Sequence, residues 1–170
     1  MITIKNRLMN KTCIAIIPAR SGSKSFKDKN ISMLNGSHLF SHSIRFAKKL
    51  NFIRQVYFLT DSSKYAKLAE KYGANVPYLR GEKNSDDLSM EEDVLFEFKN
   101  KMFIDNDINI LWLRPTHPLR DLEVFQKSFH RFIDEKLDSV CIVTEAESRI
   151  YKEKNGFLYP LNDKLLKKSM

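Results

Sequence analysis

Residues 13–30 read CIAIIPARSGSKSFKDKN, and this stretch decides the fold of the chain. Its first five residues are apolar and rich in isoleucine, which predicts a short strand that is buried on both faces. Pro18 ends the strand, and a loop of small and basic residues follows. Such a loop can bind phosphate, because small side chains let backbone N–H groups reach the anion and cations supply charge. An ordinary solvated loop remains the alternative, since neither the Walker spacing nor G-x-G-x-x-G is present.

The length and composition indicate one domain over residues 1–170, with residues 1–12 as a loose lead-in. The 170 residues are 42% hydrophobic and include 12 Phe, which favours a packed core over disorder. No apolar run is long enough for a membrane helix, and the N-terminus lacks the apolar region of a signal peptide, so we expect a cytoplasmic protein. Cys13 and Cys141 both fall in runs that predict buried strands, where reduced thiols are expected rather than a disulfide or a metal site.

The net charge of +8 permits nucleic acid as a partner but does not favour it. The lysines are spread over the predicted helix faces and the C-terminal tail, without interleaved aromatic residues. Solvated helix faces explain most of them. A small polyanionic substrate fits the basic loop better, and we expect neither nucleic acid nor a membrane as a partner.

Hydrophobic spacing along the chain alternates between strand and helix patterns. The predicted strands cover residues 13–17, 55–59, 76–79, 108–113 and 139–143. The predicted helices cover residues 39–50, 62–73, 89–102 and 122–136, and Ser62 and a Ser89–Glu92 capping box begin two of them. Asn155-Gly156 predicts a type I′ hairpin between residues 150 and 159. This order predicts an α/β fold, with a mainly parallel sheet and helices on both faces.

Polar loops follow four of the predicted strands. They contain Arg20, Asp61, the Arg80–Asp87 segment and the Arg114–Arg120 segment. Because the carboxyl ends of parallel strands meet at one edge of a sheet, we expect these loops to converge there. Four polar loops that meet at one edge support a cleft of nucleotide size more strongly than one such loop alone does.

Four segments together resemble the acylneuraminate cytidylyltransferases, also called CMP-N-acetylneuraminic acid synthetases. They are IIPARSGSKSFKDKN at 16–30, FLTD at 58–61, YGANVPYLR at 72–80 and LRPTHPLR at 113–120. They occur in the family's order and at its spacing. The resemblance implies a Rossmann-like nucleotidyltransferase fold, an αβα sandwich. It also implies a reaction that needs Mg²⁺, in which CTP and a nine-carbon 2-keto sugar acid give the CMP-sugar and pyrophosphate.

The resemblance also implies roles for individual residues. Catalysis of this kind is mainly positioning and charge neutralisation, with Arg20 and Lys29 as the catalytic cations. The implied triphosphate contacts are Arg20, Lys24 and the amides of Ser21, Gly22 and Ser23, with Lys29 at the α-phosphate and Asn30 on the nucleotide. The cytosine edge would meet Arg80 and the loop to Asp87. The sugar side would be lined by Arg114, Thr116, Arg120 and Lys152, since a guanidinium suits a carboxylate.

Several of these residues have a plainer reading. Arg120 could pair with Asp121, Asp61 could merely cap the helix after it, and His117 could fill loop space. The chain also departs from the family pattern. Ser25 stands in place of Gly, Lys27-Asp28 in place of a Pro-containing pair, and Arg114 in place of a frequent glutamine. Glu91 falls where a serine that contacts the base is common.

The family continues beyond the matched segments, through a dimerisation arm and an Asp-x-Asp segment that binds Mg²⁺. This sequence ends at Met170 without either, so the metal ligands are unknown from it. Two hypotheses follow. One is an active cytidylyltransferase for a sialic-type acid, and the other is a truncated, non-catalytic CTP-binding domain. A sugar nucleotidyltransferase that uses another base is a third option.

Overall fold

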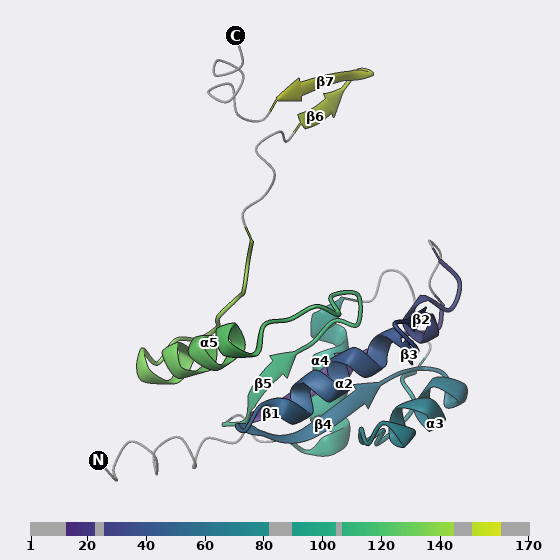
Figure 1. The fold of residues 1–170 in the computed structure, drawn as a ribbon, viewed down its shortest axis with the longest axis vertical. Coiled ribbons are helices and arrows are strands. Elements are labelled where there is room, and N and C mark those ends of the chain that lie inside the picture. The colour runs from purple at the N-terminus through teal and green to yellow at the C-terminus, as the bar shows by residue number, and fades with distance from the viewer. Residues whose placement is uncertain (1–12, 23–25, 82–89, 105–106, 145–150, 161–170) are drawn as a thin grey trace.

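The computed structural model describes residues 13–22, 26–81, 90–104, 107–144 and 151–160. Its centre is a three-stranded parallel sheet in the order β4-β1-β5 (Figure 1). The strands are β1 (Cys13–Pro18), β2 (Met33–Leu34), β3 (Ser37–His38), β4 (Ile53–Leu59), β5 (Asn109–Trp112), β6 (Tyr151–Lys154) and β7 (Phe157–Pro160). The helices are the 3₁₀ turn η1 (Lys29–Ile31) and the α-helices α2 (Leu39–Lys49), α3 (Ser63–Lys71), α4 (Glu91–Met102) and α5 (Leu122–Asp134).

Strand β1 is the middle strand of the sheet and is buried on both faces, as its apolar sequence predicts. It pairs in parallel with β4, from Cys13 opposite Ile53 to Pro18 opposite Leu59. On its other side it pairs in parallel with β5, ending at Ile16 opposite Trp112. Because neighbours cover both its edges and both its faces, its isoleucines are almost completely removed from water.

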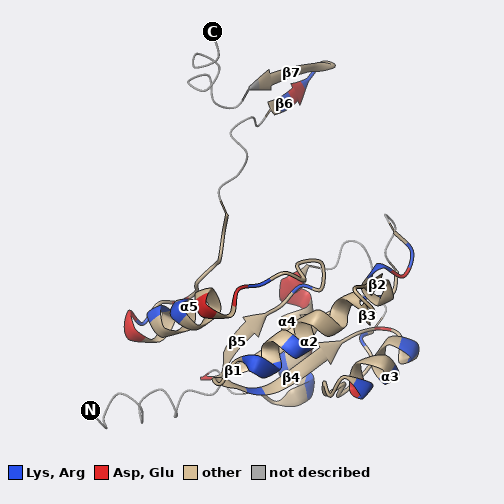
Figure 2. Cartoon of the chain, viewed as in Figure 1, with Lys and Arg blue, Asp and Glu red and all other residues tan. Residues whose placement is uncertain are grey.

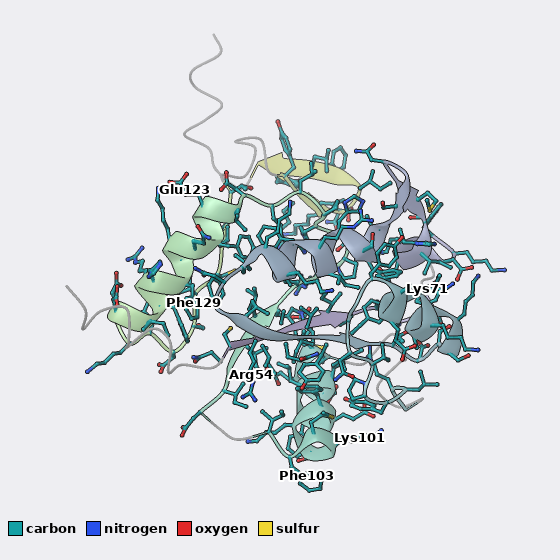
Figure 3. All side chains as sticks on the ribbon, turned by 60° about the horizontal axis from the view of Figure 1, so that its bottom comes forward. Arg54, Lys71, Lys101, Phe103, Glu123 and Phe129 are labelled. Atoms are coloured by element: carbon teal, nitrogen blue, oxygen red, sulfur yellow. The ribbon has the colours of Figure 1, made fainter. Side chains whose placement is uncertain are left out.

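Helices cover both faces of the sheet, which confirms the predicted α/β fold. On one face Ala15 and Ile17 pack with residues of α2, α3 and α5. On the other face Ile14 and Ile16 pack with Val94 of α4 and its neighbours. Figure 3 shows α4 on one side of the sheet and α2 on the other. The alternation of these four residues follows from the two-residue period of a strand.

Local capping explains where three helices begin. The Ser62 hydroxyl accepts from the Tyr65 amide at 3.4 Å and caps α3, as predicted. The Asp121 carboxylate does the same for α5, accepting from the Val124 amide at 3.0 Å. Helix α4 begins at Glu91, and the Met90 amide donates to the Asp93 carboxylate at 2.9 Å. The predicted Ser89–Glu92 box cannot be compared, since Ser89 lies outside the described residues.

Two strand predictions are wrong. Residues 76–79 form no strand, only isolated parallel bridges that join Asn75 to Tyr57 and Leu79 to Thr60. Pro77 lies between the bridges and has no N–H to continue a ladder. Residues 139–143 are also not a strand, and Cys141 is exposed instead of buried. Their β-branched sequence favours a strand, but strand formation also needs a paired neighbour.

Two hairpins have Asn-Gly turns, and the second of them is the hairpin predicted at Asn155-Gly156. Asn35 and Gly36 between β2 and β3 both have positive φ, and so do Asn155 and Gly156 between β6 and β7. Figure 1 shows β6 and β7 well apart from the sheet, and residues 151–159 are exposed. Among the described residues, no helix has the length and apolar character that crossing a membrane requires.

Candidate functional site

The candidate site lies at the carboxyl edge of the parallel sheet, where three strands end side by side. Backbone hydrogen bonds join the chain segments that leave this edge. The Ala19 amide donates to the Leu59 carbonyl at 2.9 Å, and the Leu113 amide donates to the Ile16 carbonyl at 2.9 Å. The segment after α3 joins them, because the Arg80 amide donates to the Thr60 carbonyl at 2.8 Å. The loops that follow β1, β4 and β5 therefore start from one edge, as expected for a parallel sheet.

Asp61 binds the start of the loop after β1. Its Oδ1 accepts from the Ser21 amide at 2.8 Å, and its Oδ2 accepts from the Ser21 hydroxyl at 2.9 Å. The helix-capping role that was the alternative for Asp61 belongs to Ser62 instead. Both donors of Ser21 are engaged, so Ser21 connects the loop to β4 in this structure, and the predicted phosphate contact from its amide would have to replace this bond.

The end of the same loop is held by two further hydrogen bonds. The Tyr65 hydroxyl donates to Asp28 Oδ1 at 2.8 Å. The Asn30 side chain is buried, and its Nδ2 donates to the Arg20 carbonyl at 3.0 Å. Lys29 lies between these two anchored residues, in η1, and is half-buried. The loop thus closes on itself and brings Arg20 and Lys29 to the same edge.

Arg80 is the most buried cation of the site, with 8% of its surface exposed. Burial lowers the pKa of its guanidinium, while the carboxylates of Asp61 and Glu97 raise it and the charge of Arg20 lowers it. The Arg80 segment is bonded to Thr60, next to Asp61, and Asp61 is bonded to Ser21, next to Arg20. The predicted convergence of these three loop segments at one edge is therefore confirmed.

Arg114 and Glu91 form an ion pair at the end of β5. Arg114 Nε donates to Glu91 Oε1 at 2.7 Å, and Trp112 Nε1 donates to the same oxygen at 2.8 Å. The hydrogen bond from Arg114 lowers the pKa of Glu91, against a smaller opposing effect of burial. The same pair raises the pKa of Arg114. Glu91 therefore fixes Arg114, which the sequence analysis did not foresee.

Arg120 is half-buried against α2. Its guanidinium donates to the Ser43 hydroxyl at 3.1 Å and to the Arg114 carbonyl at 2.6 Å, and lies 5.7 Å from the centre of the Phe46 ring. Burial lowers its pKa to about 10, so it is charged at neutral pH. Asp121 caps α5 instead of pairing with it. The two oxygens that accept hydrogen bonds from Arg120 are neutral, so an anion could still neutralise the charge of Arg120.

The other predicted site residues have varied positions. Gly22, Thr116 and His117 are exposed, and Thr116 Oγ1 lies 3.4 Å from His117 Nδ1. Lys152 is in β6, apart from the sheet edge in Figure 1, so the structure does not bring it to the sugar side. Its hairpin follows residues 145–150, which lie outside the described part of the chain. Ser23, Lys24 and Asp87 also lie outside it.

The sequence analysis did not identify Tyr65, Asp28 or Ser43 as residues of this edge. Tyr65 follows the pattern of an inward-facing helix residue, and its ring is indeed in the core. Only its hydroxyl reaches the loop, which hydrophobic spacing cannot reveal. Asp28, beside Lys29, is the one sequence signal of this contact, because an acidic residue within a basic loop suggests that a specific donor binds its carboxylate.

Charge is unevenly distributed around the edge. Figure 2 shows basic residues along α2 and α3 and acidic residues at the start of α4, where Glu91, Glu92 and Asp93 form the first turn. The carboxylates of Asp28, Asp61 and Glu91 are each bonded to a neighbouring donor. Within the described ranges, no group of three or more His, Cys, Asp or Glu residues could hold a metal ion. These residues alone do not form the Mg²⁺ site that the resemblance implies.

Curated relatives are similar to this chain over much of its length. A CMP-N,N'-diacetyllegionaminic acid synthase from Legionella pneumophila is 35% identical over 138 residues, 77% of this chain and 58% of the relative. A pseudaminic acid cytidylyltransferase from Campylobacter jejuni is 29% identical over 89% of this chain and 68% of its own. An N-acylneuraminate cytidylyltransferase from Escherichia coli is 39% identical over 66% of this chain and 26% of its own. The chain thus spans only part of these relatives.

Solved structures show the same fold at lower identity. A CMP:2-keto-3-deoxy-manno-octonic acid synthetase complexed with CTP has a TM-score of 0.63 at 19% identity, over 74% of this chain and 49% of that one. A 4-diphosphocytidyl-2C-methyl-D-erythritol synthase from Anaerococcus prevotii has a TM-score of 0.64 at 16% identity, over 92% of this chain and 66% of that one. The sheet and its helices therefore have the same fold as these two enzymes.

The sequence model of one family, described as cytidylyltransferase, matches residues 14–158. This range includes the sheet, the helices on both its faces and every loop of the candidate site. The chain belongs to the cytidylyltransferase family.

Proposed function

We propose that the protein transfers the cytidylyl group of CTP to a nonulosonic (sialic-type) acid and releases pyrophosphate. The observation that carries the proposal is the convergence of the Arg20, Asp61 and Arg80 segments at the carboxyl edge, beside a loop closed by the bond from Asn30 to Arg20. Family membership and three relatives named for this chemistry support it. Because the chain spans only part of those relatives, the activity is a proposal for this chain.

In the proposed reaction, the anomeric hydroxyl of the sugar acid attacks the α-phosphorus of CTP. The new bond joins that oxygen to phosphorus and the hydroxyl proton passes to solvent, while the bond from phosphorus to the oxygen that bridges the α- and β-phosphates breaks and pyrophosphate leaves. Negative charge grows on the phosphoryl oxygens and the leaving group. Lys29 would neutralise charge at the α-phosphate, and Arg20 with Lys24 would hold the departing pyrophosphate. Such catalysis depends on fixed cations, and the anchored loop provides them.

We assign the base to the Arg80 side of the edge and the sugar acid to the Arg114 and Arg120 side. Arg120 is suited to the sugar carboxylate, because its hydrogen bonds go to neutral oxygens and its charge lies half-buried. Mg²⁺ would supply charge neutralisation at the triphosphate when bound. We assign it no step, since the described residues do not form its site.

The second candidate is a CTP-binding domain without turnover. It is favoured by three described carboxylates of the edge, those of Asp28, Asp61 and Glu91, which are each bonded to a protein donor instead of a metal. A transferase for another base is a third candidate, but no relative or solved structure described above is named for one.

The test is pyrophosphate release with CTP, Mg²⁺ and a panel of nonulosonic acids, with calorimetric titration of CTP in parallel. Turnover with one of the acids, and a product mass equal to the CMP-sugar, supports the proposal. CTP binding without turnover for any acid supports the binding domain. Stronger competition by UTP, ATP or GTP than by unlabelled CTP would favour the third candidate.

A further inference from the structure

Asp28, directly before Lys29, has a backbone conformation that requires support. Its φ of 56° and ψ of 26° are in the left-handed region. Residues other than glycine are uncommon there and persist where their surroundings hold them. The Asp28 carbonyl accepts from the Ile31 amide at 3.0 Å, but its side chain does not cap the turn. Its Oδ1 accepts instead from the Tyr65 hydroxyl at 2.8 Å.

The donor in this bond is rigid. Tyr65 belongs to the first turn of α3, is 1% exposed and packs in the main core cluster. Burial raises the pKa of its hydroxyl, and the bond to Asp28 adds to the effect, so the hydroxyl is a neutral donor at physiological pH. A side chain fixed by the core thus reaches into an otherwise polar loop.

The other neighbour of Lys29 is fixed as well. Asn30 is buried, and its amide group donates to the carbonyl of Arg20, ten residues earlier in the chain. Lys29 therefore has an anchored residue on each side, one joined to α3 and one joined to the start of the loop. These two bonds add to those of Lys29 itself, whose amide donates to the Phe26 carbonyl at 3.2 Å and whose carbonyl accepts from the Ser32 hydroxyl at 2.6 Å.

We infer that Tyr65 and Asp28 are positioning residues, whose hydrogen bond orients Lys29 toward the α-phosphate. The inference rests on the proposed function, in which Lys29 acts. Neither residue is assigned a contact with substrate. Hydrogen bonds that hold the neighbours of a reacting group affect the reaction rate more than the free energy of unfolding. The reason is that a small displacement of the reacting group lowers the rate strongly.

The test uses the full chain with Tyr65→Phe, Asp28→Ala and the double variant. Tyr65→Phe keeps the buried ring and removes only the hydroxyl. We expect kcat/KM to fall about 10- to 100-fold in each single variant, mostly through kcat, and the double variant to be no slower than the worse single one. Asp28→Asn is expected to lie between wild type and Asp28→Ala, because an amide oxygen still accepts and asparagine tolerates this conformation.

The matched control is Tyr72→Phe. Tyr72 lies at the other end of α3, and its hydroxyl is joined to His38 Nδ1 at 3.0 Å, not to the loop. It should keep wild-type kinetics. An equal loss in this control, additive losses in the double variant, or a lowered unfolding midpoint with unchanged kcat would each overturn the inference.

A second readout does not depend on activity. The rate at which an acylating reagent modifies Lys29, followed by mass spectrometry, should rise in Tyr65→Phe and Asp28→Ala and stay unchanged in Tyr72→Phe. An unchanged rate in all three variants would overturn the inference. If wild type releases no pyrophosphate with any acid, the proposed activity fails, and this labelling experiment still decides whether the bond positions Lys29.

Discussion

Asp61 receives both hydrogen bonds that Ser21 can donate, one from its amide at 2.8 Å and one from its hydroxyl at 2.9 Å. These bonds cross 40 residues of sequence and join the loop after β1 to the end of β4. The same carboxylate raises the pKa of the buried Arg80 guanidinium, so it also stabilises that charge. One side chain thus connects three of the segments that form the edge.

Replacing Asp61 by alanine should therefore affect both the loop and Arg80. We expect the free energy of unfolding to fall by about 1–3 kcal/mol, the usual cost of leaving buried or half-buried donors without their acceptor. CTP affinity should also fall, because the loss of the loop's connection to β4 should outweigh the release of the Ser21 amide for phosphate. Denaturant unfolding and calorimetry measure the two effects. Asp121→Ala, which removes only the cap of α5, is the control that should leave CTP affinity unchanged.

Arg20→Ala and Lys29→Ala should abolish turnover and leave the fold intact. Both side chains belong to the loop and not to the core clusters, so their loss should shift the unfolding midpoint little. Pyrophosphate release and circular dichroism during heating provide the two measurements. Lys67→Ala, on α3 and outside the site, is a matched charge control. Unfolding of either loop variant at ordinary temperature would contradict its assignment to the site.

The ion pair between Glu91 and Arg114 should make the stability of the fold and the fluorescence of Trp112 depend on pH. The pKa of Glu91 is lowered, first by the bond from Arg114. A carboxylate with a lowered pKa stabilises the fold above its ordinary pKa, and this contribution is lost as the pH falls through its folded value. Trp112 is the single tryptophan and donates to the same oxygen, so its fluorescence should change with that titration.

The measurement is a fluorescence titration from neutral to acid pH. Wild type should show a transition below the ordinary pKa of a glutamate, and Arg114→Ala should move it to higher pH. Glu91→Gln should remove it altogether. A transition that persists unchanged in Glu91→Gln would show that another group controls the Trp112 signal.

Sequence reasoning predicted the sheet better than the site. The strands around Ile16 and Phe58 and the helices between them follow from hydrophobic period, which depends on burial alone. Contacts between segments that are distant in the sequence were harder to predict. The strand expected around Cys141 has no pairing among the described residues, and Pro77 interrupts the one expected before Arg80. The Tyr65–Asp28 and Glu91–Arg114 pairs join distant segments, and no local pattern specifies such contacts.

The two cysteines should differ strongly in reactivity. Burial raises the pKa of the Cys13 thiol to about 12, while Cys141 is exposed. The thiolate is the reactive form, so an aromatic disulfide reagent should modify one thiol quickly in the folded protein. Cys141→Ser should abolish that fast phase, and Cys13→Ser should leave it unchanged. Two slow thiols would mean that residues 139–143 are covered in solution, as the sequence first suggested.

Arg120 should lower the stability of the fold and raise the affinity for the sugar acid. Its charge is half-buried, its pKa is lowered to about 10 by burial, and its hydrogen bonds go to the neutral oxygens of Ser43 and Arg114. Because the folded pKa is below the ordinary value of 12.5, the unfolded chain binds more protons between these values, and stability rises with pH only in that alkaline range. At neutral pH the group therefore carries an uncompensated cost of burial.

Arg120→Met removes the charge and keeps a flexible apolar side chain against Phe46. We expect the unfolding midpoint to stay level or to rise by a few degrees, about what 1 kcal/mol gives in a chain of this size. Affinity for the sugar acid should fall by about tenfold or more, with CTP affinity nearly unchanged, since the base lies on the Arg80 side. Differential scanning calorimetry and titration with each ligand measure these effects separately. A midpoint lowered by more than about 5 °C would show that the two hydrogen bonds outweigh the cost of the buried charge, and an unchanged affinity for the acid would remove Arg120 from the sugar side of the edge.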